Sequence, residues 1–212
     1  MIEILLHILN WIGLIVFAIS GALLAVKHRM DLIGYILLGT ATAIGGGTFR
    51  DLILDRPVFW LNDTSQLWGS VITAAIAGIL ANEIRSNITM RSYQQILEWF
   101  DALGLSVFAI TGTMIAHNMG AHFIVSITLG MMTATGGGLI RDMIANEQPF
   151  ITQSELYASA AAIGSATVLL LQHILPLSIA VLIALLVTFS LRAGAILWGW
   201  HPPFSPKKEI NH

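Results

Sequence analysis

The sequence predicts an all-α integral membrane protein with seven transmembrane helices: an inverted three-plus-three repeat plus one extra helix. Three observations support this fold class. Apolar residues make up 56% of the 212 residues and charged residues only 10%, whereas soluble domains carry roughly 25% charge. Seven apolar segments follow one another along the chain. A glycine motif occurs twice, 91 residues apart.

Each apolar segment approaches the ~20 residues that cross ~30 Å of hydrocarbon at a rise of about 1.5 Å per residue. The segments are Ile4–Val26, Leu32–Leu54, Leu67–Ile84, Ile96–Ala116, Phe123–Ala145, Leu156–Ile174 and Leu177–Trp198. Short polar links join them, and the tail from His201 shows no apolar period. With no basic patch beyond Lys207-Lys208, the sequence argues against nucleic acid as a partner. Because it contains no cysteine, disulfides and thiolate metal sites are excluded.

The internal repeat is visible when the chain is shifted by 91 residues, because the two copies then align without a gap. Val16-Phe17-Ala18-Ile19 meets Val107-Phe108-Ala109-Ile110, and Phe59 meets Phe150. We therefore divide the chain into a first three-helix repeat (1–91), a second (92–175), a seventh helix (176–200) and a tail (201–212). Because each unit has three spans, the second copy must enter the membrane from the opposite side.

The orientation follows from the distribution of Lys and Arg over the short loops. One side of the membrane would hold Lys27, Arg29, Arg85, Arg91, Lys207 and Lys208, and the other would hold Arg56. The first side is therefore expected to be cytoplasmic. The N-terminus is then outside and the C-terminus is inside.

The motif at the centre of each repeat is Gly-Gly-Gly-x-x-Arg-Asp. It occurs as Gly45, Gly46, Gly47, Arg50 and Asp51, and again as Gly136, Gly137, Gly138, Arg141 and Asp142. Each glycine weakens a helix by about 1 kcal/mol relative to alanine. Two triplets at matching positions predict two broken spans, the pattern that marks transport sites. Close packing of helices is the alternative for a single triplet, and the symmetric pair favours the break.

Several polar side chains could act beside these breaks. The freed carbonyls and the hydroxyls of Thr42 and Thr133 could replace part of a cation's hydration shell. The Arg-Asp pairs could act as charged gates at the two mouths of a pore, or could be span ends whose arginines reach the headgroups. Because adjacent helical residues diverge, we expect each charge to find its partner on another helix. Asp101 aligns with Asn10 and could attract cations, although an interfacial polar cap is the favoured interpretation.

The doubled motif in the second and fifth spans resembles the prokaryotic members of the trimeric intracellular cation (TRIC) channel family. It is also similar to related bacterial membrane proteins that carry a glycine-transporter domain. The resemblance covers Ile4 to about Trp198. It implies a homotrimer with one pore in each protomer, lined by the two glycine triplets, and potassium as the main permeant ion.

Our first hypothesis is a potassium-permeable cation channel, with sodium as a second candidate ion, in a bacterial or archaeal inner membrane. The second hypothesis is a carrier of a small solute such as glycine, which would use the same breaks. An intramembrane enzyme or a purely structural assembly is the third. No catalytic constellation, cofactor site or structural metal site is evident. The expected partners are two further copies of the chain, monovalent cations held transiently at backbone carbonyls, and membrane lipid.

Overall fold

The computed structural model describes residues 2–152 and 156–200, and within them it confirms the all-α prediction. The long helices are α1 (Ile2–Lys27), α2 (Leu32–Ile53), α4 (Thr64–Arg85), α5 (Met90–Asn118), α6 (Phe123–Ile144) and α8 (Leu177–Trp198). The shorter elements are α3 (Phe59–Asn62), the 3-10 turn η1 (Phe150–Thr152) and α7 (Ala158–Leu171). The six long helices are each long and apolar enough to cross a membrane. The seventh expected span, α7, has 14 residues and is shorter than a full crossing requires.

The boundaries of the elements recur at the spacing of the sequence repeat. Helices α2 and α6 each have 22 residues, and both their starts and their ends lie 91 residues apart. Asp55 and Asn146, at matching positions after these helices, both have positive φ angles, of 50° and 54°. The expected start of the fourth span at Ile96 was six residues late, because α5 begins at Met90. There the Thr89 hydroxyl caps the helix by accepting a hydrogen bond from Ser92 N at 3.2 Å.

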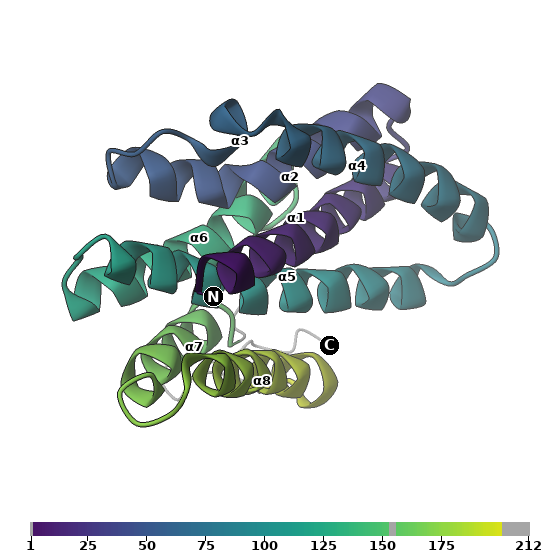
Figure 1. The fold of residues 1–212 in the computed structure, drawn as a ribbon. Coiled ribbons are helices and arrows are strands. Elements are labelled where there is room, and N and C mark those ends of the chain that lie inside the picture. Colours follow the sequence, from purple (N-terminus) through teal and green to yellow (C-terminus); the bar gives the residue numbers. More distant parts are fainter. Residues whose placement is uncertain (1, 153–155, 201–212) are drawn as a thin grey trace.

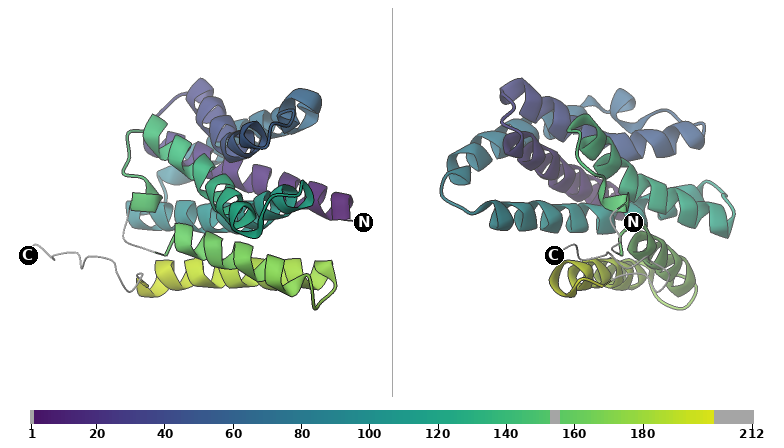
Figure 2. Two further views of the ribbon diagram at one scale, coloured as in Figure 1. Left: turned by 90° about the vertical axis from the view of Figure 1, so that its left-hand side faces the viewer. Right: turned by 180° about the vertical axis from the view of Figure 1, so that it is seen from behind.

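The two repeats have the same internal packing. In the first, α1, α2 and α4 pack against one another, and in the second α5, α6 and α7 do the same. The repeats meet where α1 packs on α5 and α2 packs on α6. Figure 1 shows α1 between α5 and the layer formed by α2 and α4, with α7 and α8 paired at the opposite edge. Both views in Figure 2 keep this order, so α1 and α5 form the centre of the fold.

Helices α1 and α5, which occupy equivalent places in the two repeats, run antiparallel. Glu3 at the start of α1 lines the same cavity as Asn118 at the end of α5. Lys27 at the end of α1 lines another cavity together with Gln94 near the start of α5. Repeat-related helices that lie side by side in opposite directions are what an inverted repeat requires.

The predicted helix breaks at the glycine triplets are wrong. Helices α2 and α6 continue through both triplets without interruption. A methyl group on Gly46 would collide with the carbonyl oxygen of Thr133, and one on Gly137 would collide with that of Thr42. The glycines therefore let the two helices approach backbone to backbone, and this contact offsets their low helix propensity. The close-packing interpretation describes the geometry.

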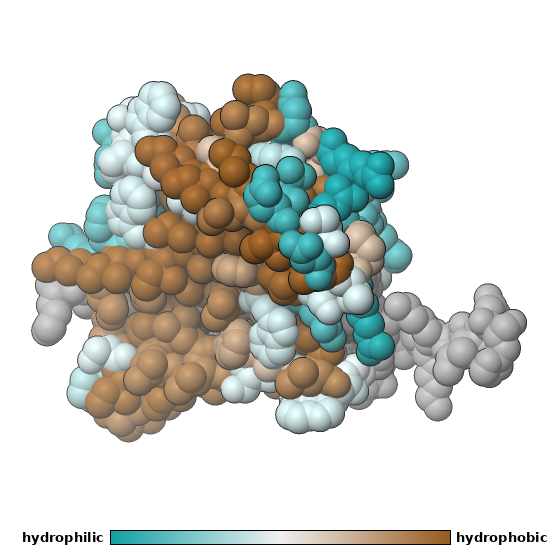
Figure 3. Space-filling view, turned by 90° about the vertical axis from the view of Figure 1, so that its right-hand side faces the viewer, coloured by the Kyte–Doolittle hydropathy of each residue, from teal (hydrophilic) through white to brown (hydrophobic). Residues whose placement is uncertain are grey.

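The outer surface carries large apolar side chains of the kind that face lipid. Examples on α4 and α8 are Ile72, Ile76, Leu80, Leu182 and Leu186, each more than half exposed. Figure 3 shows one face on which apolar residues cover a broad area beside a cluster of polar ones. Soluble monomers rarely expose so much contiguous apolar surface, so the chain is a multi-pass membrane protein.

Candidate functional site: two arginine clusters and two vestibules

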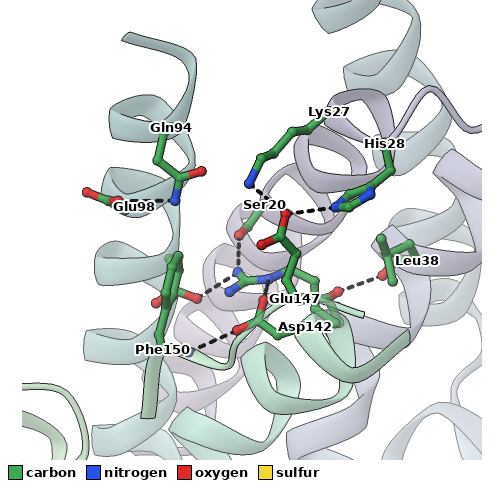
Figure 4. A network of polar contacts seen from close by, with 12 residues as sticks. Ser20, Lys27, His28, Leu38, Gln94, Glu98, Asp142, Glu147 and Phe150 are labelled. Carbon is green, nitrogen blue, oxygen red and sulfur yellow. Dashed lines mark hydrogen bonds and ion pairs between the residues drawn. The ribbon is translucent and has the colours of Figure 1, made fainter. Parts of the chain in front are cut away.

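The second repeat buries a dense charged cluster around Arg141, whose side chain is fully buried. Its Nε donates to Asp142 Oδ1 at 2.7 Å, and its Nη1 donates to Asp101 Oδ1, also at 2.7 Å. The same Nη1 donates to the Ser20 hydroxyl of α1 at 2.5 Å, and Tyr157 OH donates to Asp101 at 3.3 Å. One guanidinium thus ties together α1, α5 and α6 (Figure 4).

The first repeat has a sparser cluster around Arg50, which is 2% exposed. Its Nε donates to Asp51 Oδ1 at 2.8 Å, and Arg56 approaches the same oxygen at 3.6 Å. Where the second repeat places Asp101, the first has Asn10, whose Nδ2 donates to Gln66 Oε1 at 2.6 Å. The first cluster thus contains two arginines and one carboxylate. The second contains one arginine and two carboxylates.

The structure corrects three expectations about these charges. Arg50 and Arg141 each pair with the next residue in the chain, because the long arginine side chain bends back; the second partner of Arg141 does lie on another helix. Both arginines are enclosed within the helix bundle, and their side chains do not extend outward from its surface as the alternative of headgroup contact would require. Asp101 is no interfacial cap, because it is fully buried against Arg141.

The two motif aspartates also fix the chain that follows their helices. Asp51 Oδ2 accepts a hydrogen bond from Phe59 N at 2.9 Å, and Asp142 Oδ2 accepts one from Phe150 N at 3.1 Å. The two phenylalanine rings then face the arginines, at 5.9 Å for Arg50 and 4.9 Å for Arg141. Each motif aspartate thus closes the loop that follows its helix.

Thr42 and Thr133 lie at the contact between α2 and α6. Their hydroxyls donate to Leu38 O and Leu129 O, each at 2.6 Å. Both threonines are buried, and their own carbonyl oxygens lie against Gly137 and Gly46 of the opposite helix. The part of the chain that the structure describes holds no group of three or more His, Asp or Glu suited to a metal ion.

Two cavities flank the arginine clusters, and we call them the first and second vestibules. The first vestibule has a volume of about 340 Å³. Its lining includes Glu3, Leu6, Arg56, Phe59, Ile115 and Asn118, together with Arg50. The second vestibule has a volume of about 30 Å³. Its lining includes Gln94, Leu97, Glu147, Phe150, Leu24 and Lys27, together with Asp142.

Lys27 and His28 close the rim of the second vestibule, because both contact Glu147. Lys27 Nζ lies 2.7 Å from Glu147 Oε1, and His28 Nε2 lies 2.9 Å from the same oxygen. Figure 4 shows both side chains pointing from the end of α1 to Glu147. The hydrogen bond from Lys27 lowers the pKa of the Glu147 carboxyl, which therefore stays ionised. This group, Tyr157 and Gln66 could not be predicted from the sequence, because each contacts residues more than 50 positions away and no local pattern links them.

Comparison with known proteins identifies the family. The family model described as "Glycine transporter" matches the chain twice, over residues 7–82 and 98–173. The UPF0126 inner membrane protein YadS of Escherichia coli (strain K12) is 39% identical over 197 residues, which cover 92% of this chain and 93% of YadS. A UPF0126 membrane protein of Vibrio cholerae is 39% identical over 198 residues, covering 92% of this chain and 80% of the relative. The chain therefore belongs to the family of UPF0126 membrane proteins, which the glycine-transporter model matches.

Solved structures place the TRIC channels in the same fold family as this UPF0126 chain. The TRIC orthologue from Rhodobacter sphaeroides superimposes with a TM-score of 0.86 at 37% sequence identity, covering 92% of this chain and 99% of that one. A prokaryotic TRIC channel crystallised in 0.5 M KCl gives a TM-score of 0.85 at 30% identity, covering 94% and 100%. The resemblance read from the doubled motif is confirmed.

Proposed function

We propose that this chain is a cation channel of the inner membrane that passes potassium through each protomer of a homotrimer. The observation that carries the proposal is the match to the Rhodobacter sphaeroides TRIC channel, at a TM-score of 0.86 and 37% identity over nearly the whole of both chains. Two vestibules that flank a common pair of helices support it, because a pore needs an entrance at each end. Sodium is the second candidate ion.

The proposed ion path joins the vestibules along α2 and α6. Between them lie Gly45, Gly46 and Gly47 on α2 and Gly136, Gly137 and Gly138 on α6. In this structure the glycines bring the two backbones into contact, so the proposed path requires α2 and α6 to separate there. It would then be lined by backbone groups, beside Thr42 and Thr133. The arginine clusters then stand at the two ends. This differs from the sequence hypothesis in one respect: the helices stay intact.

The proposed orientation places the second vestibule at the cytoplasmic side. Arg29 and Arg85 line one surface cavity, so basic residues of two loops gather at one end of the molecule, as the positive-inside rule expects. Cysteines introduced at Asp63 and Asn87 should label from opposite sides of intact cells with an impermeant thiol reagent. Labelling of both from the same side would refute the inverted arrangement.

The experiment that tests the channel is potassium efflux from liposomes that contain purified trimer, with trimer content measured by gel filtration on the same samples. We expect efflux that scales with the trimer. The alternative, a carrier of a small solute, has the description of the family model in its favour. Radiolabelled glycine uptake without potassium efflux would support that alternative instead.

A further inference from the structure

The two vestibules are repeat counterparts of each other. Six of the seven residues named for the first vestibule lie 91 positions from six of the seven named for the second, so that Leu6 corresponds to Leu97 and Arg56 to Glu147. Yet the first has a volume of about 340 Å³ and the second of about 30 Å³. Equivalent parts of a duplicated fold are thus found in two states, one open and one closed.

The two vestibules also differ in the side chains at their rims. At the second vestibule Lys27, the last residue of α1, and His28, directly after it, both contact Glu147, which follows α6. These contacts join the end of α1 to the loop after α6 (Figure 4). Lys27 and Glu147 are 23% and 33% exposed, so they close the cavity from its solvent side.

The first vestibule has no equivalent contact between a helix end and the loop opposite within the described residues. Its residues at the equivalent positions are Asn118, Met119 and Arg56. One cation and two neutral side chains cannot form an ion pair. Within residues 2–152 and 156–200, Arg56 forms its ion pair with Asp51, on its own side of the cavity.

We propose that Lys27, His28 and Glu147 form a gate, which opens and closes the second vestibule while the first stays open. The gate rests on the proposed function, since it controls one end of the proposed pore. A single gate suits a channel, because a carrier must close its two ends in alternation. Ion pairs with partly exposed side chains contribute little stability and are weakened by salt. The closed state is therefore poised to open.

The test uses a thiol reporter, which is clean because the chain has no cysteine. Leu97→Cys places a thiol in the closed vestibule, and Leu6→Cys places one at the equivalent position of the open vestibule. In purified trimer the impermeant reagent should modify position 6 rapidly and position 97 slowly. Glu147→Gln should raise the rate at position 97 by up to roughly fivefold and leave position 6 unchanged. Gln94→Cys is the second reporter if Leu97→Cys fails to assemble.

Two further variants sharpen the test. Glu83→Gln removes a carboxylate from the exposed end of α4 and should leave both rates unchanged. The charge exchange Lys27→Glu with Glu147→Lys should restore slow modification at position 97, since it rebuilds the ion pair. An unchanged rate at position 97 in Glu147→Gln would overturn the gate.

Potassium efflux from liposomes separates this proposal from the proposed function. If the gate and the channel are both correct, Glu147→Gln raises efflux together with the modification rate. A faster rate at position 97 without efflux from any variant would keep the gate and reject the channel. Efflux from the wild-type protein together with an unchanged rate at position 97 would keep the channel and reject the gate.

Discussion

The two arginine clusters occupy equivalent positions of one duplicated fold and differ in how tightly they are held. Arg141 has two carboxylate partners and a hydroxyl, from three helices. Arg50 has the carboxylate of its neighbour, and the second arginine at its side, Arg56, is partly exposed. The first cluster therefore has a formal charge of +1 and the second a charge of −1. One unit of this difference comes from Asn10 in place of an aspartate, and the other comes from Arg56.

The difference in charge between the clusters parallels the difference in volume between the two vestibules. The cluster with two carboxylates lies beside the closed vestibule, and the one with an excess arginine lies beside the open one. The two ends share the same arrangement of helices and differ in a few side chains at the clusters and at the rims of the cavities. We infer that the asymmetry between the ends, rather than either cluster alone, is the functional feature of this fold.

The largest expected effect is on the tight cluster. Asp101→Ala leaves Arg141 with one carboxylate in a buried site, and removing one partner of a buried ion pair costs about 3–5 kcal/mol. The counterpart, Asn10→Ala, removes a neutral hydrogen bond worth about 0.5–1.5 kcal/mol. Thermal unfolding of both variants in detergent gives the comparison. Equal losses of stability would show that the two clusters are equivalent.

The second effect is on the helix contact that both repeats share. Gly46→Ala and Gly137→Ala each push a methyl group into a carbonyl of the opposite helix, and overpacking of this kind costs about 1–3 kcal/mol. Because the two contacts are reciprocal, the two variants should be destabilised alike. Gly120→Ala is the control: Gly120 has a positive φ angle, and a methyl group added there would have no neighbour within 4 Å. It therefore tests backbone strain without overpacking. The same flux per trimer in Gly46→Ala and Gly137→Ala as in the wild type would remove the glycines from the ion path.

The smallest effect comes from making the first cluster resemble the second. Asn10→Asp adds a carboxylate beside Arg50, at the position equivalent to that of Asp101, and cancels the excess positive charge. Potassium flux at low salt should rise by about twofold to fivefold, since a nearby unit charge in a wet site contributes about 1 kcal/mol. The gain should shrink at high salt. Asn87→Asp, in the loop between α4 and α5, is the control and should change nothing.

The sequence supports the fold more firmly than the site. The repeat, the long helices and the family follow from hydropathy and one doubled motif, because both are local patterns. The sequence does not predict that the helices continue through the glycine triplets, because helix propensity is a weak preference that tertiary packing can override. Asp101 illustrates the limit as well. The alignment showed a carboxylate opposite Asn10, and only the fold shows that it meets Arg141, 40 residues away.

The central claim, that an ion path joins the two vestibules through each protomer, is tested most directly by single-channel recording of purified trimer in a planar bilayer. We expect unitary potassium currents, far above the turnover of any carrier, with a higher open probability in Glu147→Gln. Intact trimers that give no unitary current in either protein, under the same conditions, would contradict the account.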